Sequence, residues 1–404
     1  MKIAMFSDSF FPIMGGREMV IDNCVKILNK KNNCFVCAPK IKGEIKGKTD
    51  ADLPYKVYRC NSIRVSKSEY LSTPNHKFKK QVESEKPDII HCQTKYGMLT
   101  YAFKLRKKFH IPVVTTVHTN YFDVYRNTLP KLIAKIALGY IKSQLNKCDH
   151  IFTVSNKMKG RLEQMGVKTP IQVIRNGIHK PADIKPKEEA INFVNEKFGI
   201  DKDTFVICYV GRIVDVKNIP FQLETIKNLA SKTKKKFLFL LIGDGPDRKK
   251  YEEYCKENNL ENYVKFTGAI SDRDILNSIY QRANLNYFAS VADSDGLTIP
   301  ESALFETPSL VIADTAGAER INNLHNGFIE EHSTEKVKKL LFDILENKYN
   351  LTEIGENAKN EIPADWNDIV EKFEEKYKEI IENYKKNWHF CQFFFFLLIF
   401  KDFN

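Results

Sequence analysis

The chain has 404 residues, 43% of them hydrophobic and 28% charged, which is the composition of a globular protein too long for one hydrophobic core. Its net charge of +12 is uneven, because residues 1–180 hold 33 basic and 13 acidic side chains, a net of +20, and the remainder is net −8. A basic first half is expected to meet an anionic partner, which leaves nucleic acid, anionic lipid and phosphorylated substrates open.

The cysteines and the N-terminus argue against a disulfide-stabilised secreted protein. Nine cysteines are an odd number, and Cys24, Cys92, Cys148 and Cys208 lie in apolar runs typical of reduced, buried thiols. The N-terminal run 1–6 has the pattern of a first strand rather than of a signal peptide. We therefore expect a cytoplasmic protein.

In the first half, short apolar runs alternate with longer amphipathic ones. We predict strands at 3–7, 34–39, 88–93, 113–118, 150–155 and 171–174, and helices at 20–31, 96–109, 130–146 and 156–165. Apolar strands that alternate with helices indicate a parallel sheet covered on both faces. The first domain is expected to span residues 1–180.

A breaker-rich segment, 181–203, is interpreted as an interdomain linker because Pro181 and Pro186 stand there among charges. The alternation then restarts, and a second doubly wound domain is expected over 204–363. Its strands are predicted at 205–210, 237–242, 263–266, 285–288 and 309–313, and its helices at 220–230, 248–258, 272–282, 300–305 and 335–346. A final helix, 364–386, is expected to return to the first domain.

The tail, 387–404, contains a run of eleven almost entirely apolar residues, Phe390–Phe400. This run is shorter than the roughly 20 residues that a membrane-spanning helix needs. Two interpretations stay open: an interfacial anchor behind Lys385 and Lys386, or an extension with no role.

Two positions in the first half could contact a ligand. Gly15 and Gly16 precede a predicted helix, where backbone N–H groups can approach an anion closely. His118 ends a predicted strand, where a histidine can donate to a sugar hydroxyl or to a developing charge. Each feature alone is more often an ordinary turn or a structural histidine.

Strand ends in the second half carry charges and glycines. Arg212 and Lys217 lie in the loop after the strand 205–210, and a guanidinium with an ammonium suits a diphosphate. Gly243 and Gly245 end the next strand and would bring backbone close to a ligand. Surface cations on a loop are the commoner explanation for such a pair taken alone.

The stretch Asp293–Glu301 lies between a predicted strand and a predicted helix, and its two terminal acids could hold hydroxyls of a sugar or ribose. Its Asp293-Ser-Asp295 also matches the DxD pattern of metal-dependent glycosyltransferases. The pattern recurs at 201–203 and 272–274, at predicted helix starts where aspartate caps N–H groups. We therefore expect no metal site and no cofactor.

Taken in order, these features resemble the family-4 retaining glycosyltransferases of GT-B fold over roughly residues 1–385. The matching features are Gly15-Gly16, His118, Asn176-Gly-Ile178, Arg212 with Lys217, Gly243-Asp-Gly-Pro246, and an acid, Asp293, separated by seven residues from Glu301. The resemblance implies an α/β protein of two Rossmann-like doubly wound domains that face a central cleft. It also implies metal-independent transfer with retention from a nucleotide sugar.

The resemblance assigns a role to each matching residue. Gly15 and Gly16 would face the donor phosphates, and Arg212 and Lys217 would neutralise the diphosphate. The other roles fall to Glu301 for the ribose hydroxyls, Asp293 for the donor sugar, His118 near the reacting face, and Gly243, Gly245, Gly296 and Leu297 for further donor contacts.

Two departures narrow the resemblance. The family's Glu-x-Phe-Gly is here Asp293-Ser-Asp295-Gly296, with a shorter first acid and a polar residue at the phenylalanine position. A polar residue there resembles the bacterial diacylglycerol glucosyltransferases, as do the segments Asp8–Pro12 and Val117–Tyr121.

The predicted helix 130–146 carries Lys131, Lys135 and Lys142 beside an apolar stripe. Basic amphipathic helices lie on anionic membranes, although a core helix with a solvated lysine edge has the same pattern. We predict a peripheral enzyme of the cytoplasmic leaflet that moves a hexose, from UDP-glucose, to a lipid such as 1,2-diacylglycerol. Alternatives are a polyprenyl-linked or soluble saccharide acceptor, a binding-only relative, and a nucleic-acid-binding protein, which lacks a recognition motif here.

Overall fold

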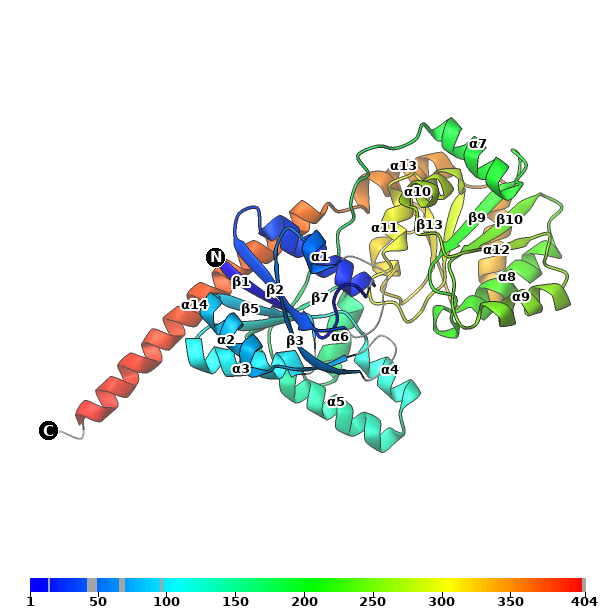
Figure 1. The fold of residues 1–404 in the computed structure, drawn as a ribbon. Helices are drawn as coiled ribbons and strands as arrows, with labels where there is room; N and C mark the ends of the chain where they lie inside the picture. The colour runs from blue at the N-terminus through cyan, green and yellow to red at the C-terminus, as the bar shows by residue number, and fades with distance from the viewer. Residues whose placement is uncertain (14, 42–48, 65–69, 95–96, 402–404) are drawn as a thin grey trace. The chain divides into compact units, whose positions relative to one another are not determined.

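A computed structural model describes residues 1–13, 15–41, 49–64, 70–94 and 97–401, without the side chains of 127, 128 and 389–401. The chain forms two compact units (Figure 1). The first unit is Met1–Asn176 together with Trp366–Asn404, and the second is Gly177–Asp365. The first residue of the predicted helix Tyr96–Phe109 lies outside the described residues. The side chains of the apolar run in the tail lie outside them as well.

The first unit is an eight-stranded sheet with helices on its faces. Its elements are β1 (Lys2–Phe6), α1 (Gly16–Leu28), β2 (Asn33–Pro39), β3 (Lys56–Arg64), β4 (Tyr70–Thr73), α2 (His76–Glu85), β5 (Ile89–Cys92), α3 (Gly97–Phe109), β6 (Val113–Val117), α4 (Tyr121–Thr128), α5 (Lys131–Leu145), β7 (His150–Thr153), α6 (Asn156–Gln164), β8 (Ile171–Val173) and α14 (Trp366–Lys401). The strand order is β4-β3-β2-β1-β5-β6-β7-β8, and every pairing is parallel except β3 with β4.

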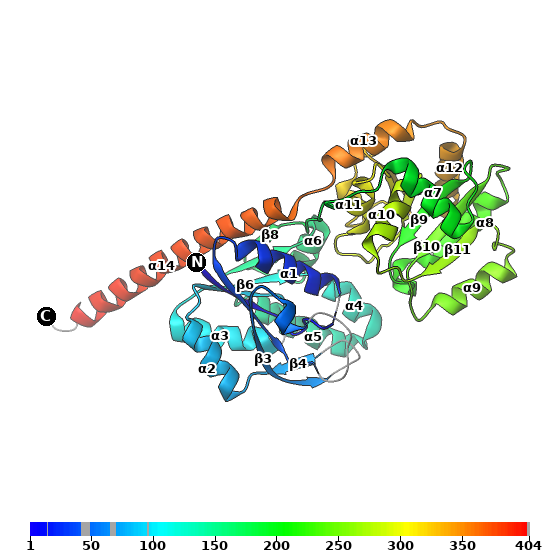
Figure 2. The same cartoon turned by 45° about the horizontal axis from the view of Figure 1, so that its top comes forward.

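Strand β1 is buried on both faces of the sheet. Four consecutive apolar residues, 3–6, are buried, as expected where helices cover both faces of a parallel strand. Helix α14 returns from the end of the chain and lies beside α1 in both views (Figures 1 and 2). Its Phe373 packs on Phe152 of β7 with ring centroids 4.9 Å apart. The final helix is therefore part of the first unit's core.

The second unit is a six-stranded, fully parallel sheet of order β11-β10-β9-β12-β13-β14. Its elements are α7 (Lys187–Phe198), β9 (Phe205–Val210), α8 (Ile219–Ala230), β10 (Phe237–Ile242), α9 (Arg248–Glu257), β11 (Val264–Gly268), α10 (Arg273–Arg282), β12 (Leu285–Phe288), α11 (Thr298–Ala303), β13 (Ser309–Ile312), β14 (Phe328–Glu330), α12 (Thr334–Leu345) and α13 (Leu351–Glu361). One core joins α8, α9 and α12 to one face of the sheet, and a second joins α7 and α10 to the other.

Both sheets have a topological switch point, where consecutive β-α units diverge to opposite sides of the starting strand. In the first unit it lies between β1 and β5, and in the second between β9 and β12. Ligands of open α/β sheets bind outside the carboxyl ends of the strands at such points. The loops β1–α1, β5–α3, β9–α8 and β12–α11 are therefore the places to look for chemistry.

The structure corrects three sequence interpretations. Residues 181–203 are not a free linker, because α7 within them buries Ala190, Val194 and Phe198, spaced four apart, against the second unit. Strands β3, β4 and β14 and helices α2, α4 and α13 were not predicted. Strand β3, next to the edge strand β4, has only one buried residue in nine. Asp272 does cap its helix, accepting from the N–H of Asp274 at 2.9 Å, but Asp201 follows the end of α7 instead of starting a helix.

Candidate active site

At the switch point of the second unit, the β9–α8 loop and the β12–α11 loop are joined by an ion pair. The ammonium of Lys217 donates to Oδ1 of Asp293. The second carboxylate oxygen, Oδ2, is buried and has no hydrogen-bond partner among the described residues. Arg212, in the same loop as Lys217, is exposed to solvent. The structure thus brings together two of the predicted site residues from distant parts of the sequence.

The β9–α8 loop is held in shape by its own polar contacts. The N–H of Asp215 donates to Asp247 at 2.9 Å, and the Asp215 carboxylate accepts from Lys250 at 3.0 Å and from Tyr251. The hydrogen bonds from Tyr251 and from Lys250 hold the pKa of the Asp215 carboxyl below its usual value. At the far end of the loop, the Asn218 side chain donates to the carbonyl of Ala289 at 3.0 Å, which ties the loop to the end of β12.

Gly243 and Gly245 support this loop from the β10–α9 turn. A Cβ atom at Gly243 would lie 1.8 Å from the carbonyl oxygen of Gly211, and one at Gly245 would lie 2.0 Å from that of Ile213. The backbone of Ile213 also donates to the carbonyl of Asp244 at 3.0 Å. Close packing of two backbones therefore requires glycine here, and direct contact of these glycines with a donor stays a prediction.

In the β12–α11 loop, Gly296 has φ +72°, and a Cβ there would lie 3.0 Å from Ile299. Leu297 follows as the N-cap of α11 and is half-buried. Glu301 is fixed at both oxygens, by Arg273 at 3.1 Å and by the hydroxyl of Tyr280 at 3.2 Å. The second acid of the stretch is thus pre-oriented by α10.

Asp295, the residue at the family's phenylalanine position, is buried. Its carboxylate is paired with the guanidinium of Arg320, whose Nε also donates to the Asp295 carbonyl at 3.2 Å. Both side chains are buried, at 7% and 3% exposure. The acid that replaces the family's phenylalanine therefore has a buried partner, Arg320, 25 residues later in the chain.

At the switch point of the first unit, Gly15 is the N-cap of α1 and Gly16 is its first residue. A Cβ at Gly15 would lie 2.6 Å from a carboxylate oxygen of Glu18, whereas a Cβ at Gly16 would meet no atom within 4 Å. Glu18 is buried and accepts from Arg17 at 3.1 Å. This carboxylate, which was not predicted from the sequence, lies close to the predicted phosphate site.

His118 follows β6 and is half-buried. Its Nε2 is hydrogen-bonded to Oε1 of Gln93, which follows β5. Burial, and secondarily the charge of Arg17, lowers the pKa of His118 to about 3. The imidazole is therefore neutral over the physiological pH range.

Comparison with known proteins gives the same assignment in both halves of the chain. Residues 14–180 match the family described as Glycosyltransferase Family 4, and residues 191–361 match the one described as Glycosyl transferases group 1. The chain is a glycosyltransferase with a family-4 domain followed by a group-1 domain. The family and the enzyme class, a hexosyltransferase, are thus as predicted.

Individual relatives have low identity but match most of the chain. An alpha-monoglucosyldiacylglycerol synthase of Acholeplasma laidlawii is 24% identical over 371 residues, 89% of this chain and 92% of that protein. One of the same name from Streptococcus pneumoniae is 26% identical, covering 80% and 73%. Among solved structures, HepE of Anabaena in complex with UDP has a TM-score of 0.72 at 17% identity, covering 94% of this chain and 100% of that one. The GT-B fold class is thereby confirmed.

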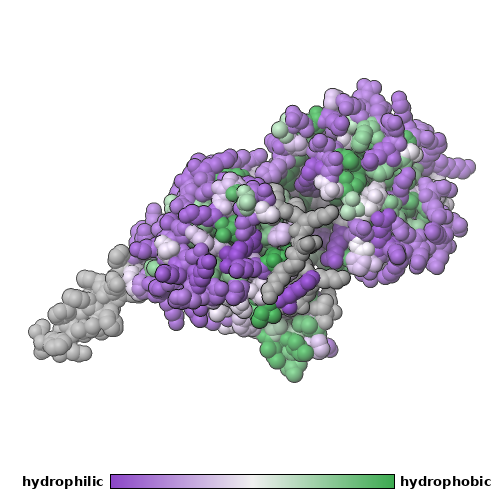
Figure 3. All heavy atoms as spheres, viewed as in Figure 1, coloured by the Kyte–Doolittle hydropathy of each residue, from purple (hydrophilic) through white to green (hydrophobic). Residues whose placement is uncertain are grey.

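On this glycosyltransferase, α5 has two apolar faces rather than one. Ala134, Ile141 and Leu145 are buried in the first unit. The opposite face exposes apolar side chains, with Lys131 and Lys135 also exposed beside them (Figure 3). The exposed fractions are 70% for Leu132, 52% for Ile133, 65% for Ile136 and 45% for Tyr140. This set of four is called the α5 patch below.

Lys142 differs from the other two predicted lysines. It is half-buried, and its ammonium lies 2.7 Å from where a Cβ of Gly166 would be. It therefore packs toward the end of α6 rather than onto the exposed face. Helix α5 therefore differs from both interpretations of the sequence, a basic amphipathic helix and a core helix with a solvated lysine edge, because its solvent face is itself apolar.

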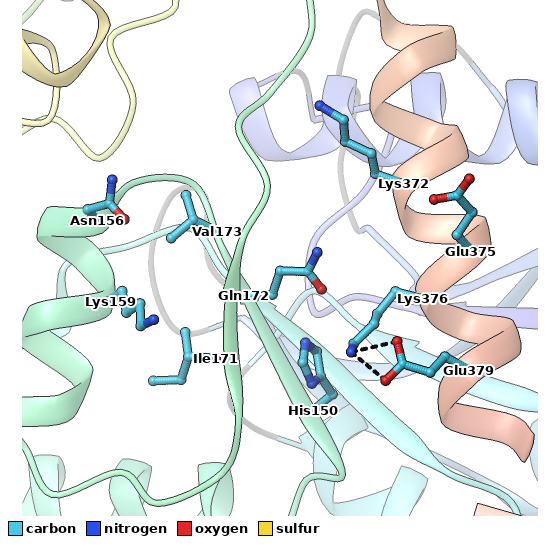
Figure 4. A pocket seen from close by; sticks show the side chains of 10 residues that line it. All are labelled: His150, Asn156, Lys159, Ile171, Gln172, Val173, Lys372, Glu375, Lys376 and Glu379. Carbon is cyan, nitrogen blue, oxygen red and sulfur yellow. Dashed lines mark hydrogen bonds and ion pairs between the residues drawn. The ribbon is translucent and has the colours of Figure 1, made fainter. Parts of the chain in front are cut away.

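A cavity of 580 Å³ opens elsewhere in the first unit, between β7, β8 and α14 (Figure 4). Lys376 and Glu379 of α14 turn toward each other there, with an ion pair of 2.8 Å. The complete lining is His150, Asn156, Lys159, Ile171, Gln172, Val173, Lys372, Glu375, Lys376 and Glu379, and it includes no predicted site residue. Within the described ranges, no group of three or more His, Cys, Asp or Glu could hold a metal ion, and no helix has the length and apolar character of a membrane span.

Sequence reasoning missed the residues that hold the site. Arg273 and Tyr280 hold Glu301, and Arg320 holds Asp295. Gln93 holds His118. Gln93 could have been found, because it directly follows the buried run Ile89–Cys92 at a strand's carboxyl end. The arginines carry no such signal, since they lie in helices or short turns among many other cations.

Proposed function

We propose that this enzyme transfers a hexose, with retention of configuration, from a UDP-sugar to the hydroxyl of a membrane lipid such as 1,2-diacylglycerol. UDP-glucose is the proposed donor. The observation that carries the proposal is the contact between Lys217 and Asp293 at the switch point of the second unit. It places a cation suited to a diphosphate against an acid suited to a sugar.

The charges of the β9–α8 loop suit the leaving group. Arg212 is exposed, and Lys217 uses one of its three ammonium hydrogens on Asp293, so both can donate to phosphate oxygens. As the bond from the anomeric carbon to the β-phosphate oxygen breaks, negative charge grows on the diphosphate. Fixed cations stabilise such charge strongly because they need no reorganisation. We therefore propose that no metal ion or other cofactor is required.

The two acids of the β12–α11 loop suit hydroxyls. Oδ2 of Asp293 is a buried acceptor with no hydrogen-bond partner among the described residues, and a buried acceptor of this kind gains most from a donor. Glu301 is oriented by Arg273 and Tyr280, which favours a fixed contact with the ribose. A new bond from the acceptor oxygen forms on the same face of the sugar, and the hydroxyl proton leaves with the diphosphate.

The α5 patch supports a membrane acceptor. Exposed apolar residues rimmed by Lys131 and Lys135 have the chemistry of a helix that lies in an anionic interface. Two relatives are named monoglucosyldiacylglycerol synthases, and HepE was solved with UDP. These findings favour a UDP-sugar donor, a lipid acceptor and peripheral association with the cytoplasmic leaflet.

A donor and acceptor screen tests the proposal. Radiolabelled UDP-glucose and UDP-galactose would be offered with diacylglycerol in anionic vesicles and, separately, with soluble sugars. We expect solvent-extractable label from UDP-glucose with diacylglycerol, abolished by Glu301→Ala and retained by Glu356→Ala, an exposed acid on α13. Label that appears only in soluble sugar would contradict the lipid acceptor, and transfer that survives Glu301→Ala would contradict the donor site.

A further inference from the structure

A chain of buried polar side chains runs from His118 into the core of the first unit. Gln93, directly after β5, contacts His118 at one end of its amide and His91 at the other. His91 in turn is bonded through Nδ1 to the hydroxyl of Tyr377 on α14. Its Nε2 lies 2.7 Å from the hydroxyl oxygen of Thr116. Two strands and the last helix therefore meet in one hydrogen-bonded chain.

The orientation of the Gln93 amide is fixed by Met5. The amide nitrogen of Gln93 lies 3.4 Å from the Met5 sulfur and 3.1 Å from Nε2 of His91. A thioether sulfur can only accept, so the group facing it must be the NH₂. The same NH₂ donates to Nε2 of His91, which is thus unprotonated, and Nδ1–H of His91 donates to Tyr377.

At the other end, the amide oxygen of Gln93 can only accept. The proton in its contact with His118 therefore belongs to Nε2 of His118. Because the imidazole is neutral, its other nitrogen, Nδ1, carries a lone pair. A histidine in this state accepts a hydrogen bond at Nδ1 and cannot donate there.

The surroundings keep the chain neutral. Burial lowers the pKa of His91 to about 3, with smaller contributions from His118 and His150, and raises the pKa of Tyr377 well above its ordinary value. The charge that acts on His118 is that of Arg17 on α1. No member of the chain changes its protonation near neutral pH, so the direction of each hydrogen bond is preserved.

We infer that Gln93, His91 and Tyr377 are positioning residues that fix His118 as the tautomer protonated on Nε2, so that Nδ1 accepts from a substrate hydroxyl. The inference rests on the proposed role of His118 beside the transferred sugar. It reverses the expectation that His118 donates. The hydroxyl class that such an acceptor suits is a neutral one, on the sugar or on the incoming acceptor, rather than a phosphate oxygen.

A purely structural role is the alternative. Buried polar networks are costly when incomplete, and apolar side chains would pack this space without that cost. Here each of the three side chains, Gln93, His91 and Tyr377, has a partner, and the chain ends at a residue on the switch-point edge of the sheet. The two roles differ in what a measurement on His118 itself would show.

The first test is ¹⁵N NMR of the histidine rings in the wild-type protein, which needs no substrate. We expect His118 to be neutral at pH 7, with a protonated Nε2 and an unprotonated Nδ1. The reverse tautomer, or a charged ring, would overturn the inference. Since this readout is independent of catalysis, it decides the matter even if transfer to lipid is not observed.

The second test compares substitutions by kinetics. Gln93→Met should mix the His118 tautomers and lower kcat on the order of 10- to 100-fold, with KM for the UDP-sugar little changed. Gln93→Glu keeps an acceptor but adds charge, so it should retain the tautomer and move the pH profile toward a protonated His118. Tyr377→Phe acts at the far end and should have a smaller effect in the same direction.

Thr115→Val is the matched control, because Thr115 is equally buried on β6 and donates to the Cys92 carbonyl at 2.8 Å outside the chain. It should leave the tautomer and the pH profile unchanged. If Gln93→Met does so too, the positioning role is wrong. If His118→Ala itself leaves transfer unchanged, the proposed function of His118 fails instead, which separates the two claims.

Discussion

The predicted site residues differ in charge between the two switch points, although both sheets diverge in the same way from their first strand. In the second unit, Lys217 and Asp293 form an ion pair and Glu301 is held by Arg273. In the first unit, Arg17 and Glu18 form an ion pair at the start of α1, whereas His118 and Gln93, at the ends of β6 and β5, are hydrogen-bonded and uncharged. The charged edge of the second unit suits the ionised part of a donor, and the uncharged pair of His118 and Gln93 suits hydroxyl groups.

The net charge of each half does not predict where the proposed diphosphate site lies. Residues 1–180 are net +20, yet the cations proposed for the diphosphate lie in the remaining, net acidic part of the chain. The excess lysines of the first half include Lys131 and Lys135, which are exposed beside the α5 patch. Net charge therefore reports on the kind of surface that a domain meets, whereas the chemistry depends on a few charges at the strand ends.

The largest expected effect concerns Asp295, which we regard as structural where Asp293 is functional. Arg320→Met would remove the guanidinium that pairs with the buried Asp295 carboxylate and should cost about 3–5 kcal/mol of the free energy of unfolding. Urea denaturation monitored by circular dichroism measures it. The double variant Asp295→Phe with Arg320→Met should recover most of the loss. A single variant as stable as wild type would contradict the structural role.

Arg212→Ala tests the charged edge of the second unit. Because Arg212 is exposed, its loss should leave stability unchanged and lower kcat by roughly 100-fold or more, the usual cost of removing a donor to a developing charge. The assay is transfer of labelled hexose from the UDP-sugar. Lys227→Ala, a partly exposed lysine on α8, is the control. Equal rates in both variants would remove Arg212 from the site.

Acidic substitutions in the α5 patch test whether it binds the membrane. Leu132→Glu together with Ile136→Glu should lower sedimentation with anionic vesicles at least about tenfold, since two exposed apolar side chains lose their burial in the interface. The control is Ile184→Glu, which alters a residue exposed at 50% in the second unit. Undiminished vesicle binding by the double variant would show that the patch does not contact the membrane.

The smallest expected effect is a pH dependence of the first unit's stability. Burial lowers the pKa of His91 and His118 to about 3 and of His150 to about 4, below the unfolded value near 6.5. Between these values the unfolded chain binds more protons, so the first unit should lose stability as the pH falls from about 6.5 toward 4. Above pH 6.5 their contribution is complete.

His150→Asn should lower the slope of the unfolding free energy against pH, by an amount that corresponds to at most about one bound proton. Thermal denaturation followed at several pH values, compared with wild type, gives the slope. A variant with the wild-type slope would mean that His150 ionises alike in both states.

The placement of the site could be predicted from the sequence, but the contacts that hold it could not. Alternation of strands and helices puts Lys217 and Asp293 after strands, and parallel strands end at one edge of a sheet, so their proximity follows from the pattern. The partners of Asp295 and His91 lie in remote elements, and Tyr377 is 286 residues from His91. Such pairings depend on how helices pack onto the sheet, which periodicity does not determine.

The most direct measurement of the account is hydrogen–deuterium exchange with and without UDP. We expect UDP to protect the backbone of 211–218 and 293–301 in the second unit, the two loops joined by Lys217 and Asp293. Protection at the ends of β5 and β6 should require the complete UDP-sugar or an acceptor. Protection by UDP that is absent from both loops of the second unit would contradict the assignment of the donor site to the charged edge.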